Sequence, residues 1–263
     1  MKAKVTVLGC GNSTGVPSIG NNWGVCDPNE PRNHRMRSSI MVESDTTKIV
    51  VDTGPDFHWQ LNRTDVSIID AVLFTHQHSD HVNGIDELRA NTFRRKKLTP
   101  IYGNKETLDD LKRRWDHMFN GGAIELYPPL LEPIEITPSM YQKPFQLGDM
   151  SIIPHELDHT SCRPLGYRFG DFAYSVDMVR MEQPSIDALK GIKTWMVDAA
   201  GYKKTDYIVH ADLKTIYKLN EQIGAEQVIL TSLALDMDYK TLCDELPDGY
   251  VPAHDMMTFE INL

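Results

Sequence analysis

Three histidines and one aspartate lie within residues 76–81, which read His-Gln-His-Ser-Asp-His. The largely apolar run 68–74 precedes them directly and predicts a buried strand, whereas Asn83-Gly84 soon afterwards predicts a turn. These side chains therefore belong on a loop that leaves a strand end, where rigid scaffolds often display functional groups. Imidazole nitrogens and carboxylate oxygens are ligands of zinc and similar divalent ions. The segment 76–81 therefore predicts a metal-binding loop, which we call the metal loop.

Other polar residues follow strand-like segments elsewhere in the chain. Asp52 ends the run 49–51, Asp177 ends the run 174–176, and His159 comes shortly after Ile152-Ile153. A single histidine or aspartate of this kind is more often a surface or capping residue. Their order and spacing relative to residues 76–81 instead predict several strand ends that converge on one metal-bearing edge.

The elements that must position these residues can be read from the hydrophobic pattern. Strand signals recur at 5–8, 39–43, 48–52, 71–75, 151–153, 165–169, 172–176, 194–197 and 228–231, and helices are expected at 55–62, 85–96, 105–117 and 212–223. The proline-rich passage 127–144 looks like a linker, but strand signals resume directly after it. We therefore expect one domain over residues 1–263, built as a layered α/β (α+β) sandwich.

Composition limits the location and the partners of the protein. The chain has 263 residues, of which 41% are hydrophobic, and a formal net charge of −10. This charge argues against a nucleic-acid polymer as the main partner. No run reaches the length of a membrane span and no secretory signal precedes the first strand, which predicts a cytoplasmic protein. A homodimer is compatible with the sequence.

The cysteines and one basic run allow further predictions. Four widely spaced cysteines form no CxxC pair and favour reduced thiols over two disulfides: Cys10, Cys26, Cys162 and Cys243. The segment 89–97 carries five basic side chains. A solvated helix face is the simpler interpretation. The alternative is a patch that guides an anionic substrate to the metal loop.

Taken with Asp52, His159 and Asp177, the segment 76–81 resembles the metallo-β-lactamase superfamily, and the resemblance covers nearly the whole chain. It implies a four-layered αβ/βα sandwich with metals at the edge of two facing sheets. It further implies a first metal held by His76, His78 and His159, a second metal held by Asp80 and His81, and a bridging Asp177.

The resemblance also gives Asp52 a role, namely to orient the metal loop through hydrogen bonds. The alternative is an ordinary strand-end aspartate in an Asp-Thr-Gly turn.

Two metals roughly 3.5–4 Å apart can share a hydroxide at neutral pH and clamp the attacking and leaving oxygens. Such a centre suits hydrolysis of phosphodiesters or esters.

One position departs from the family pattern. Superfamily hydrolases supply a further histidine to the second metal after a late strand, whereas this chain has Ser232 there and Ala234 where close relatives often have another. A serine hydroxyl is a poor ligand compared with imidazole. Three outcomes stay open: water completes the second site, only one metal is bound, or a nearby side chain replaces the histidine. The side chains considered for that replacement are Asp236, Asp238 and His254.

The opening segment narrows the resemblance. Residues 8–17, with Trp23-Gly24-Val25-Cys26, are similar to the branch that contains the cyclic phosphodiesterase of the carbon–phosphorus lyase pathway and ribonuclease Z. Gly9, Gly11 and Gly15 allow sharp turns and a close approach of backbone to ligand, or serve a tight structural loop. The cysteine-rich zinc element of that phosphodiesterase is absent, because only Cys26 remains. The tRNA-binding arm of ribonuclease Z is not evident.

His210 lies in a His-Ala-Asp-Leu segment that matches the phosphodiesterase branch. The resemblance implies that His210 lies beside the metals and protonates the leaving oxygen or holds the phosphate, which suits imidazole. The alternative is a histidine at a helix start near a capping Asp212. Weaker candidates for a phosphate anchor are Arg32, His34, Arg35 and Arg37.

The sequence therefore predicts a metal-dependent hydrolase that uses one or two Zn²⁺ or Mn²⁺ ions. The leading hypothesis is a phosphodiesterase for a small cyclic or nucleotide-like phosphate, in which a metal-held hydroxide attacks phosphorus and Asp80, His210 and Asp52 serve catalysis. One alternative is a carboxylic ester, thioester or lactone hydrolase on the same metal core. Another is a degenerate member that binds a phosphate metabolite or a metal with little turnover.

Overall fold

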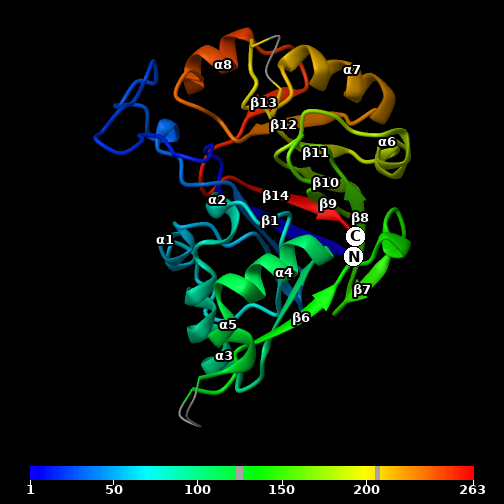
Figure 1. Cartoon of the computed structure of the whole chain (residues 1–263). Coiled ribbons are helices and arrows are strands. Elements are labelled where there is room, and N and C mark those ends of the chain that lie inside the picture. Colours follow the sequence, from blue (N-terminus) through cyan, green and yellow to red (C-terminus); the bar gives the residue numbers. More distant parts are fainter. Residues whose placement is uncertain (123–126, 205–207) are drawn as a thin grey trace.

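The computed structural model describes residues 1–122, 127–204 and 208–263. Within these ranges, two seven-stranded sheets face each other (Figure 1). The first sheet has the order β14 (Thr258–Asn262), β1 (Lys2–Gly9), β2 (Ser39–Glu43), β3 (Lys48–Val51), β4 (Ala71–Leu73), β5 (Thr99–Gly103) and β6 (Leu131–Glu135). The second has the order β13 (Tyr250–Pro252), β12 (Gln227–Thr231), β11 (Thr194–Asp198), β10 (Phe172–Ser175), β9 (Leu165–Phe169), β8 (Met150–Glu156) and β7 (Phe145–Leu147).

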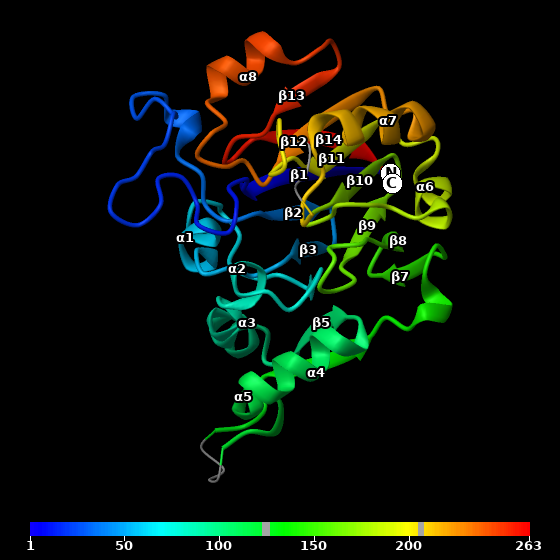
Figure 2. The same ribbon diagram turned by 45° about the horizontal axis from the view of Figure 1, so that its top comes forward.

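Helices cover the outer face of each sheet (Figures 1 and 2). The first sheet is flanked by α1 (Phe57–Asn62), α2 (Ser79–Val82), α3 (Leu88–Arg95), α4 (Lys105–Arg114) and α5 (Asp116–Asn120). The second is flanked by α6 (Gln183–Leu189), α7 (Leu213–Ile223) and α8 (Tyr239–Glu245). Short 3-10 helices lie at η1 (Pro31–Asn33), η2 (Ile85–Glu87) and η3 (Pro138–Met140). The predicted four-layered α+β sandwich is confirmed.

Two buried clusters hold the layers together. Side chains between the sheets, such as Val5, Ile40 and Tyr167, belong to one cluster with apolar residues of α6 and α7. Side chains between the first sheet and its helices, such as Val72 and Leu108, form the other. Burial of such apolar area is the main favourable term in folding. No helix among the described residues is long and apolar enough to cross a membrane.

Several boundaries differ from the sequence expectations. The helix expected at 105–117 is divided at Trp115 into α4 and α5. The helix expected at 85–96 begins as η2, and it ends where Lys96 adopts a left-handed φ of 55°. The proline-rich passage contains β6 and η3 and is not a linker. Pro133 is tolerated in β6 because that strand lies at the edge of its sheet.

The strand directions explain where polar side chains gather. β3 and β4 run parallel in the first sheet, and β10, β11 and β12 run parallel in the second. Parallel neighbours place their carboxyl ends at one edge. Three residues that follow these strands have left-handed backbones, namely Asp52 (φ 65°), Asp177 (φ 52°) and Ser232 (φ 57°). Such conformations are uncommon for residues other than glycine and often mark functional sites.

Candidate metal centre

Four of the predicted ligands meet at this edge. His76 and His78 follow β4, His159 follows β8, and Asp177 follows β10. One ligand atom from each side chain lies within 4.8 Å of the corresponding atoms of the other three. His76, His159 and Asp177 are buried and His78 is half-buried. The site therefore combines side chains from both sheets.

A second group combines Asp80 and His81 of α2 with the same Asp177. Asp177 Oδ2 lies 3.6 Å from Nε2 of His76 and 3.6 Å from Nε2 of His159. Its other oxygen, Oδ1, lies 3.5 Å from Nε2 of His81. The two carboxylate oxygens are thus directed to different groups, which is the arrangement that a carboxylate needs in order to bridge two cations.

Hydrogen bonds fix which nitrogen of each histidine faces the centre. The carbonyl oxygen of Val209 can only accept, so His159 Nδ1, 2.6 Å away, is the donor. The hydroxyl of Thr75 donates to Asp52, and it therefore accepts from His76 Nδ1 at 3.0 Å. Both histidines are left with a basic Nε2 directed at Asp177. Contacts of this kind fix the tautomer that binds a metal.

Asp52 is fully buried and lies behind the metal loop. It accepts hydrogen bonds from the backbone N–H and the hydroxyl of Thr75, both at 2.8 Å, and from Nδ1 of His81 at 2.7 Å. The structure therefore places Asp52 where it orients His81 and anchors the start of the loop.

The electrostatic field of the site favours a bound positive charge. Burial lowers the pKa of His76 well below its usual value. Burial also disfavours a charged His81, but Asp80, Asp177 and Asp52 outweigh this effect and raise the pKa of that imidazole well above its usual value. Despite burial, His81 and His76 hold the pKa of Asp177 well below its ordinary range. The carboxylates therefore attract a cation to this position.

The residues present fit a divalent metal ion. His76 Nε2 is buried and has no hydrogen-bond partner among the described residues, which is costly unless another group binds it. Three imidazoles and a carboxylate form the first group, and one imidazole with two carboxylates forms the second. Imidazole nitrogens and carboxylate oxygens of this kind are ligands that divalent metal ions accept in proteins.

Asp198, the last residue of β11, belongs to the site although the sequence reasoning did not single it out. Its Oδ2 lies 2.5 Å from Nδ1 of His210, and its Oδ1 accepts from the N–H of Ala200 at 2.8 Å. Burial alone would lower the pKa of His210, but Asp198 outweighs it and raises that pKa to about 9. The signal that could have identified Asp198 is an acidic residue directly after a run of apolar residues, as at Asp52 and Asp177.

A cavity of about 90 Å³ adjoins the second ligand group. Asp80, His81 and Asp177 line one part of it, and Lys204, His210 and Ser232 are among the residues that line the rest. Ser232 Oγ lies 3.2 Å from Ser38 Oγ. The serine that replaces the expected histidine thus faces the cavity, within a small cluster of hydroxyl groups.

None of the three substitutes considered for that histidine joins a ligand group within the described ranges. Asp238 caps α8 by accepting from the N–H of Thr241. Asp236 forms an ion pair of 3.1 Å with Lys204, and His254 Nδ1 lies 3.1 Å from a backbone oxygen. The structure does not support the replacement of the histidine by one of these side chains. Two outcomes remain: water completes the second site, or only one metal is bound.

The weaker phosphate anchors are engaged in structural contacts. Arg32 pairs with Glu30 at 2.6 Å, and Arg37 pairs with Asp56 at 3.1 Å. The buried Arg35 donates to Asn33 Oδ1 and to the carbonyl of Ala234. The ring of His34 packs edge-on against Trp23. These contacts favour a structural role for the segment 32–37.

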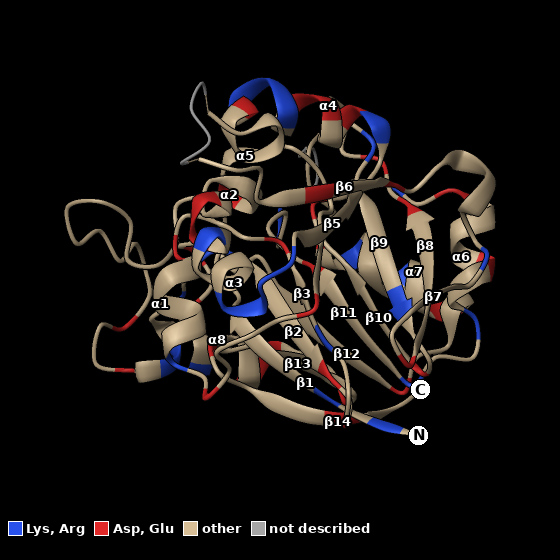
Figure 3. Cartoon of the chain, turned by 90° about the horizontal axis from the view of Figure 1, so that it is seen from below, with Lys and Arg blue, Asp and Glu red and all other residues tan. Residues whose placement is uncertain are grey.

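The basic run 89–97 lies on α3 and just beyond it, and Figure 3 shows the Lys and Arg residues of α3 in blue. Arg94 donates to the carbonyl of Ser67, and Arg95 donates to that of Asp70. Both carbonyls precede β4, whereas the metal loop leaves the other end of that strand. This placement supports the solvated helix face rather than a guide for substrate.

The opening glycines also have a structural reason. A Cβ added at Gly9 would lie 2.2 Å from the carbonyl oxygen of Arg37, and one added at Gly11 would lie 2.9 Å from that of Arg35. Gly11 in addition lines the cavity beside the metal ligands.

The four cysteines are free, and Cys243 is the exposed one.

Comparisons with known proteins agree with this geometry. The family model of the beta-lactamase superfamily domain matches residues 47–231. An octanoyltransferase of Porphyromonas gingivalis is 32% identical over 231 residues, which are 87% of this chain and 45% of that protein. A ribonuclease Z of Bradyrhizobium sp. is 25% identical over 146 residues, which are 54% of this chain and 46% of that protein. The chain spans about half the length of these two curated relatives.

Among solved structures, a diphosphatase from the PhnP family superposes with a TM-score of 0.88 at 30% identity, covering 99% of this chain and 98% of the other. The family model covers well over half of the chain, and the two facing sheets carry the candidate metal-ligand groups at their common edge. The chain therefore belongs to the beta-lactamase superfamily of metal-dependent hydrolases.

Proposed function

We propose that this protein is a metal-dependent phosphodiesterase that acts on a small anionic phosphate, cyclic or nucleotide-like. The observation that carries the proposal is the position of Asp177, which directs one oxygen to each ligand group while His210 lines the adjoining cavity. A bridging carboxylate suits a pair of ions, and two-metal sites are widely used to displace a group at phosphorus.

In this proposal, His76, His78, His159 and Asp177 hold one Zn²⁺ or Mn²⁺ ion, and Asp80, His81 and Asp177 hold a second. Bound ions of this kind supply Lewis acidity and a nucleophile at neutral pH. Asp52 holds Nδ1 of His81, so that Nε2 is the ring nitrogen directed at Asp80 and Asp177. Because Ser232 provides a hydroxyl in place of an imidazole, we expect the second ion to bind more weakly than the first.

In this proposal, His210 donates the proton that the leaving oxygen needs. Its Nδ1 is held by Asp198 at 2.5 Å, and its raised pKa of about 9 keeps the imidazole protonated at neutral pH. General acids contribute when they are protonated and close to the leaving group. Lys204 lines the same cavity, where its ammonium group is paired with Asp236.

Three further observations support phosphate over a carboxylic ester and a small substrate over a polymer. One of the similar solved structures is that of a diphosphatase, and the similarity covers nearly the whole length of both chains. The cavity measures about 90 Å³, which suits a phosphoryl group with a small substituent. The net charge of −10 disfavours the binding of long nucleic acids.

A second candidate function is the hydrolysis of an acyl ester or thioester on the same metal centre. The octanoyltransferase relative, at 32% identity, motivates it, although this chain spans only 45% of that protein. The metal ligands alone do not choose between phosphorus and carbon. Medium-chain acyl substrates therefore belong in the first assay.

The test is a hydrolysis assay with added Zn²⁺ or Mn²⁺ on cyclic nucleotides, bis(p-nitrophenyl) phosphate, a nucleoside diphosphate, p-nitrophenyl octanoate and an octanoyl thioester. We expect metal-dependent turnover of a phosphoester, with loss in the Asp177→Ala variant. Faster turnover of the octanoyl substrates would favour the second candidate. Metal binding without turnover of any substrate would contradict both and indicate a degenerate member.

A further inference from the structure

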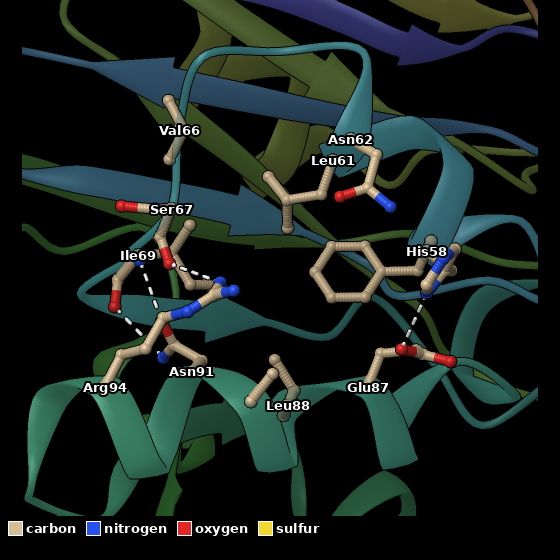
Figure 4. A pocket seen from close by; sticks show the side chains of 12 residues that line it. His58, Leu61, Asn62, Val66, Ser67, Ile69, Glu87, Leu88, Asn91 and Arg94 are labelled. Atoms are coloured by element: carbon tan, nitrogen blue, oxygen red, sulfur yellow. Dashed lines mark hydrogen bonds and ion pairs between the residues drawn. The ribbon is translucent and has the colours of Figure 1, made fainter.

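A pocket of about 140 Å³ lies between α1 and α3, and it shares no lining residue with the cavity at the candidate metal centre (Figure 4). Residues of α1, of the segment before β4 and of η2 and α3 line it. Figure 4 shows Leu61 and Leu88 directed toward the same space, which Phe57 also lines. Because these elements come from separate parts of the chain, the pocket is a feature of the tertiary fold.

Half of the residues that line the pocket are apolar and half are polar. Among the apolar ones, Phe57, Ile69 and Leu88 are almost fully buried, and Leu61 is half-buried. The volume is close to that of a cavity of ~150 Å³ that binds benzene. Pockets that combine apolar walls with polar groups that fix the orientation of a ligand are typical of small-molecule sites. The pocket therefore suits a single aromatic ring or a short alkyl chain.

The polar groups at the two ends of the pocket differ. At one end, His58 Nδ1 lies 3.0 Å from Glu87 Oε2, so the acidic group already has a partner. At the other end, Arg94 donates to the carbonyl of Ser67 at 3.1 Å, and no carboxylate of the described residues lies within ion-pair distance of it. The Asn91 side chain is occupied, since it accepts from the N–H of Ile69 and donates to its carbonyl.

Figure 4 shows the guanidinium of Arg94 extending from α3 toward the apolar side chains. A guanidinium without an acidic partner recognises carboxylates through paired hydrogen bonds. We propose that this pocket is a ligand site, separate from the candidate metal centre, for a small amphiphilic carboxylate. The apolar body lies against Phe57, Leu61 and Leu88, and the carboxylate binds Arg94.

The site also lies next to the metal loop. A Cβ added at Gly84, in the turn that follows that loop, would lie 2.8 Å from Cβ of Phe57. The backbone of Gly84 donates to the carbonyl of Thr53, and that of Phe57 donates to the carbonyl of Gly54. A ligand in the pocket therefore contacts the side chain against which the turn of the loop packs.

The experiment is a titration of the full-length protein, with and without metal, followed by amide chemical shifts in NMR spectra. The probes are benzoate, hexanoate and the uncharged benzyl alcohol. We expect benzoate or hexanoate to bind with a Kd on the order of millimolar, as ligands of this size do. Shifts should concentrate at residues 57–69 and 87–94, and they should persist without metal.

Two variants and a control test the assignment. Arg94→Gln should weaken carboxylate binding roughly tenfold, as expected for loss of a charge-assisted hydrogen bond. Arg89→Gln, on the same helix but outside the pocket, should leave it unchanged. Leu61→Trp should fill the pocket and abolish binding. If it fails to fold, the comparison of Arg94→Gln with Arg89→Gln decides alone.

Three results would overturn the proposal: no shifts in these segments up to the solubility limit of the probes, equal binding of benzyl alcohol and benzoate, or equal binding by wild type and Arg94→Gln. Binding that requires added metal would also contradict it, because it would place the carboxylate at the metal centre. None of these outcomes depends on whether the protein hydrolyses a phosphoester.

Discussion

Asp52 and His81 form a hydrogen bond of 2.7 Å between two side chains that are almost entirely buried. Asp52 follows β3, whereas His81 lies on α2 at the far end of the metal loop. Asp52 also holds Thr75 at the start of that loop. One carboxylate thus fixes both ends of the segment that carries four predicted ligands.

Replacement of Asp52 by alanine should weaken metal binding by roughly 10–100-fold, because partners of metal-bound histidines contribute to affinity by that factor. The loss should be greater for the ion held by Asp80 and His81. Competition with a chromogenic chelator measures it. Asp56→Ala, which removes the Arg37 ion pair outside the centre, is the matched control. Equal affinity in wild type and Asp52→Ala would exclude the orienting role.

Removal of metal should destabilise the protein. Without a cation, the carboxylates and imidazoles of the centre are buried with incomplete partners, whereas binding stabilises the native state by mass action. We expect the melting temperature to fall on treatment with a chelator and to recover with Zn²⁺ or Mn²⁺. The Asp177→Ala variant should show a much smaller metal-dependent change, since Asp177 serves both groups. A similar change in that variant would count against the bridging geometry.

The sequence predicted the parts of the fold that consist of buried apolar runs followed by polar residues. The strand at 39–43 was predicted with its observed bounds, and Asp52, His159 and Asp177 lie beside the metal loop as expected. The edge strand β6 was missed, because its five residues include Pro133 and two glutamates and so carry a weak strand signal.

Asp198 was missed for a different reason. Its apolar strand was identified, but its role depends on a contact with His210, twelve residues later, which only the tertiary fold creates. The exclusion of Asp236, Asp238 and His254 from the ligand groups likewise depends on loop geometry after β12. Hydrophobic periodicity carries no information about either feature.

Replacement of Ser232 by histidine should increase the metal bound per chain at limiting metal concentration, because imidazole is a far better ligand than a hydroxyl. The left-handed φ of 57° at this position is one that histidine adopts more readily than most residues. Elemental analysis after gel filtration measures the change, with Ser232→Ala as the control. A wild-type protein that already holds two ions per chain would contradict the expectation.

Replacement of Asp198 by asparagine should move the alkaline limb of activity to lower pH. A general acid works while it is protonated, so activity is retained below the pKa of His210, about 9, and is lost above it. Because Asp198 raises the pKa of His210, the replacement of Asp198 lowers the pH at which activity declines. Profiles of kcat/KM against pH for an alkyl phosphodiester test this. An aryl phosphodiester, whose leaving group needs little protonation, is the control and should show a smaller shift.

Asp255 should make the protein less stable as the pH rises from about 4 to about 6. Its side chain is 4% exposed and accepts from the N–H of Cys10 and of Met36. Burial raises its pKa to about 6, so the folded state keeps a proton that the unfolded chain has already lost in this range. The stabilising contribution of Asp255 is complete below its pKa in the unfolded chain, falls with rising pH, and is gone above its pKa in the folded state.

This contribution can be isolated by comparing wild type with Asp255→Ala in urea unfolding. The substitution should destabilise more at pH 4 than at pH 7, by on the order of 2–3 kcal/mol for a shift of about two units. Asp149 and Asp238, with pKa values of about 2, lose their own contribution only as the pH falls below about 4. The exposed Asp45→Ala serves as control. A destabilisation by Asp255→Ala that is independent of pH would show that this carboxyl ionises normally in the folded protein.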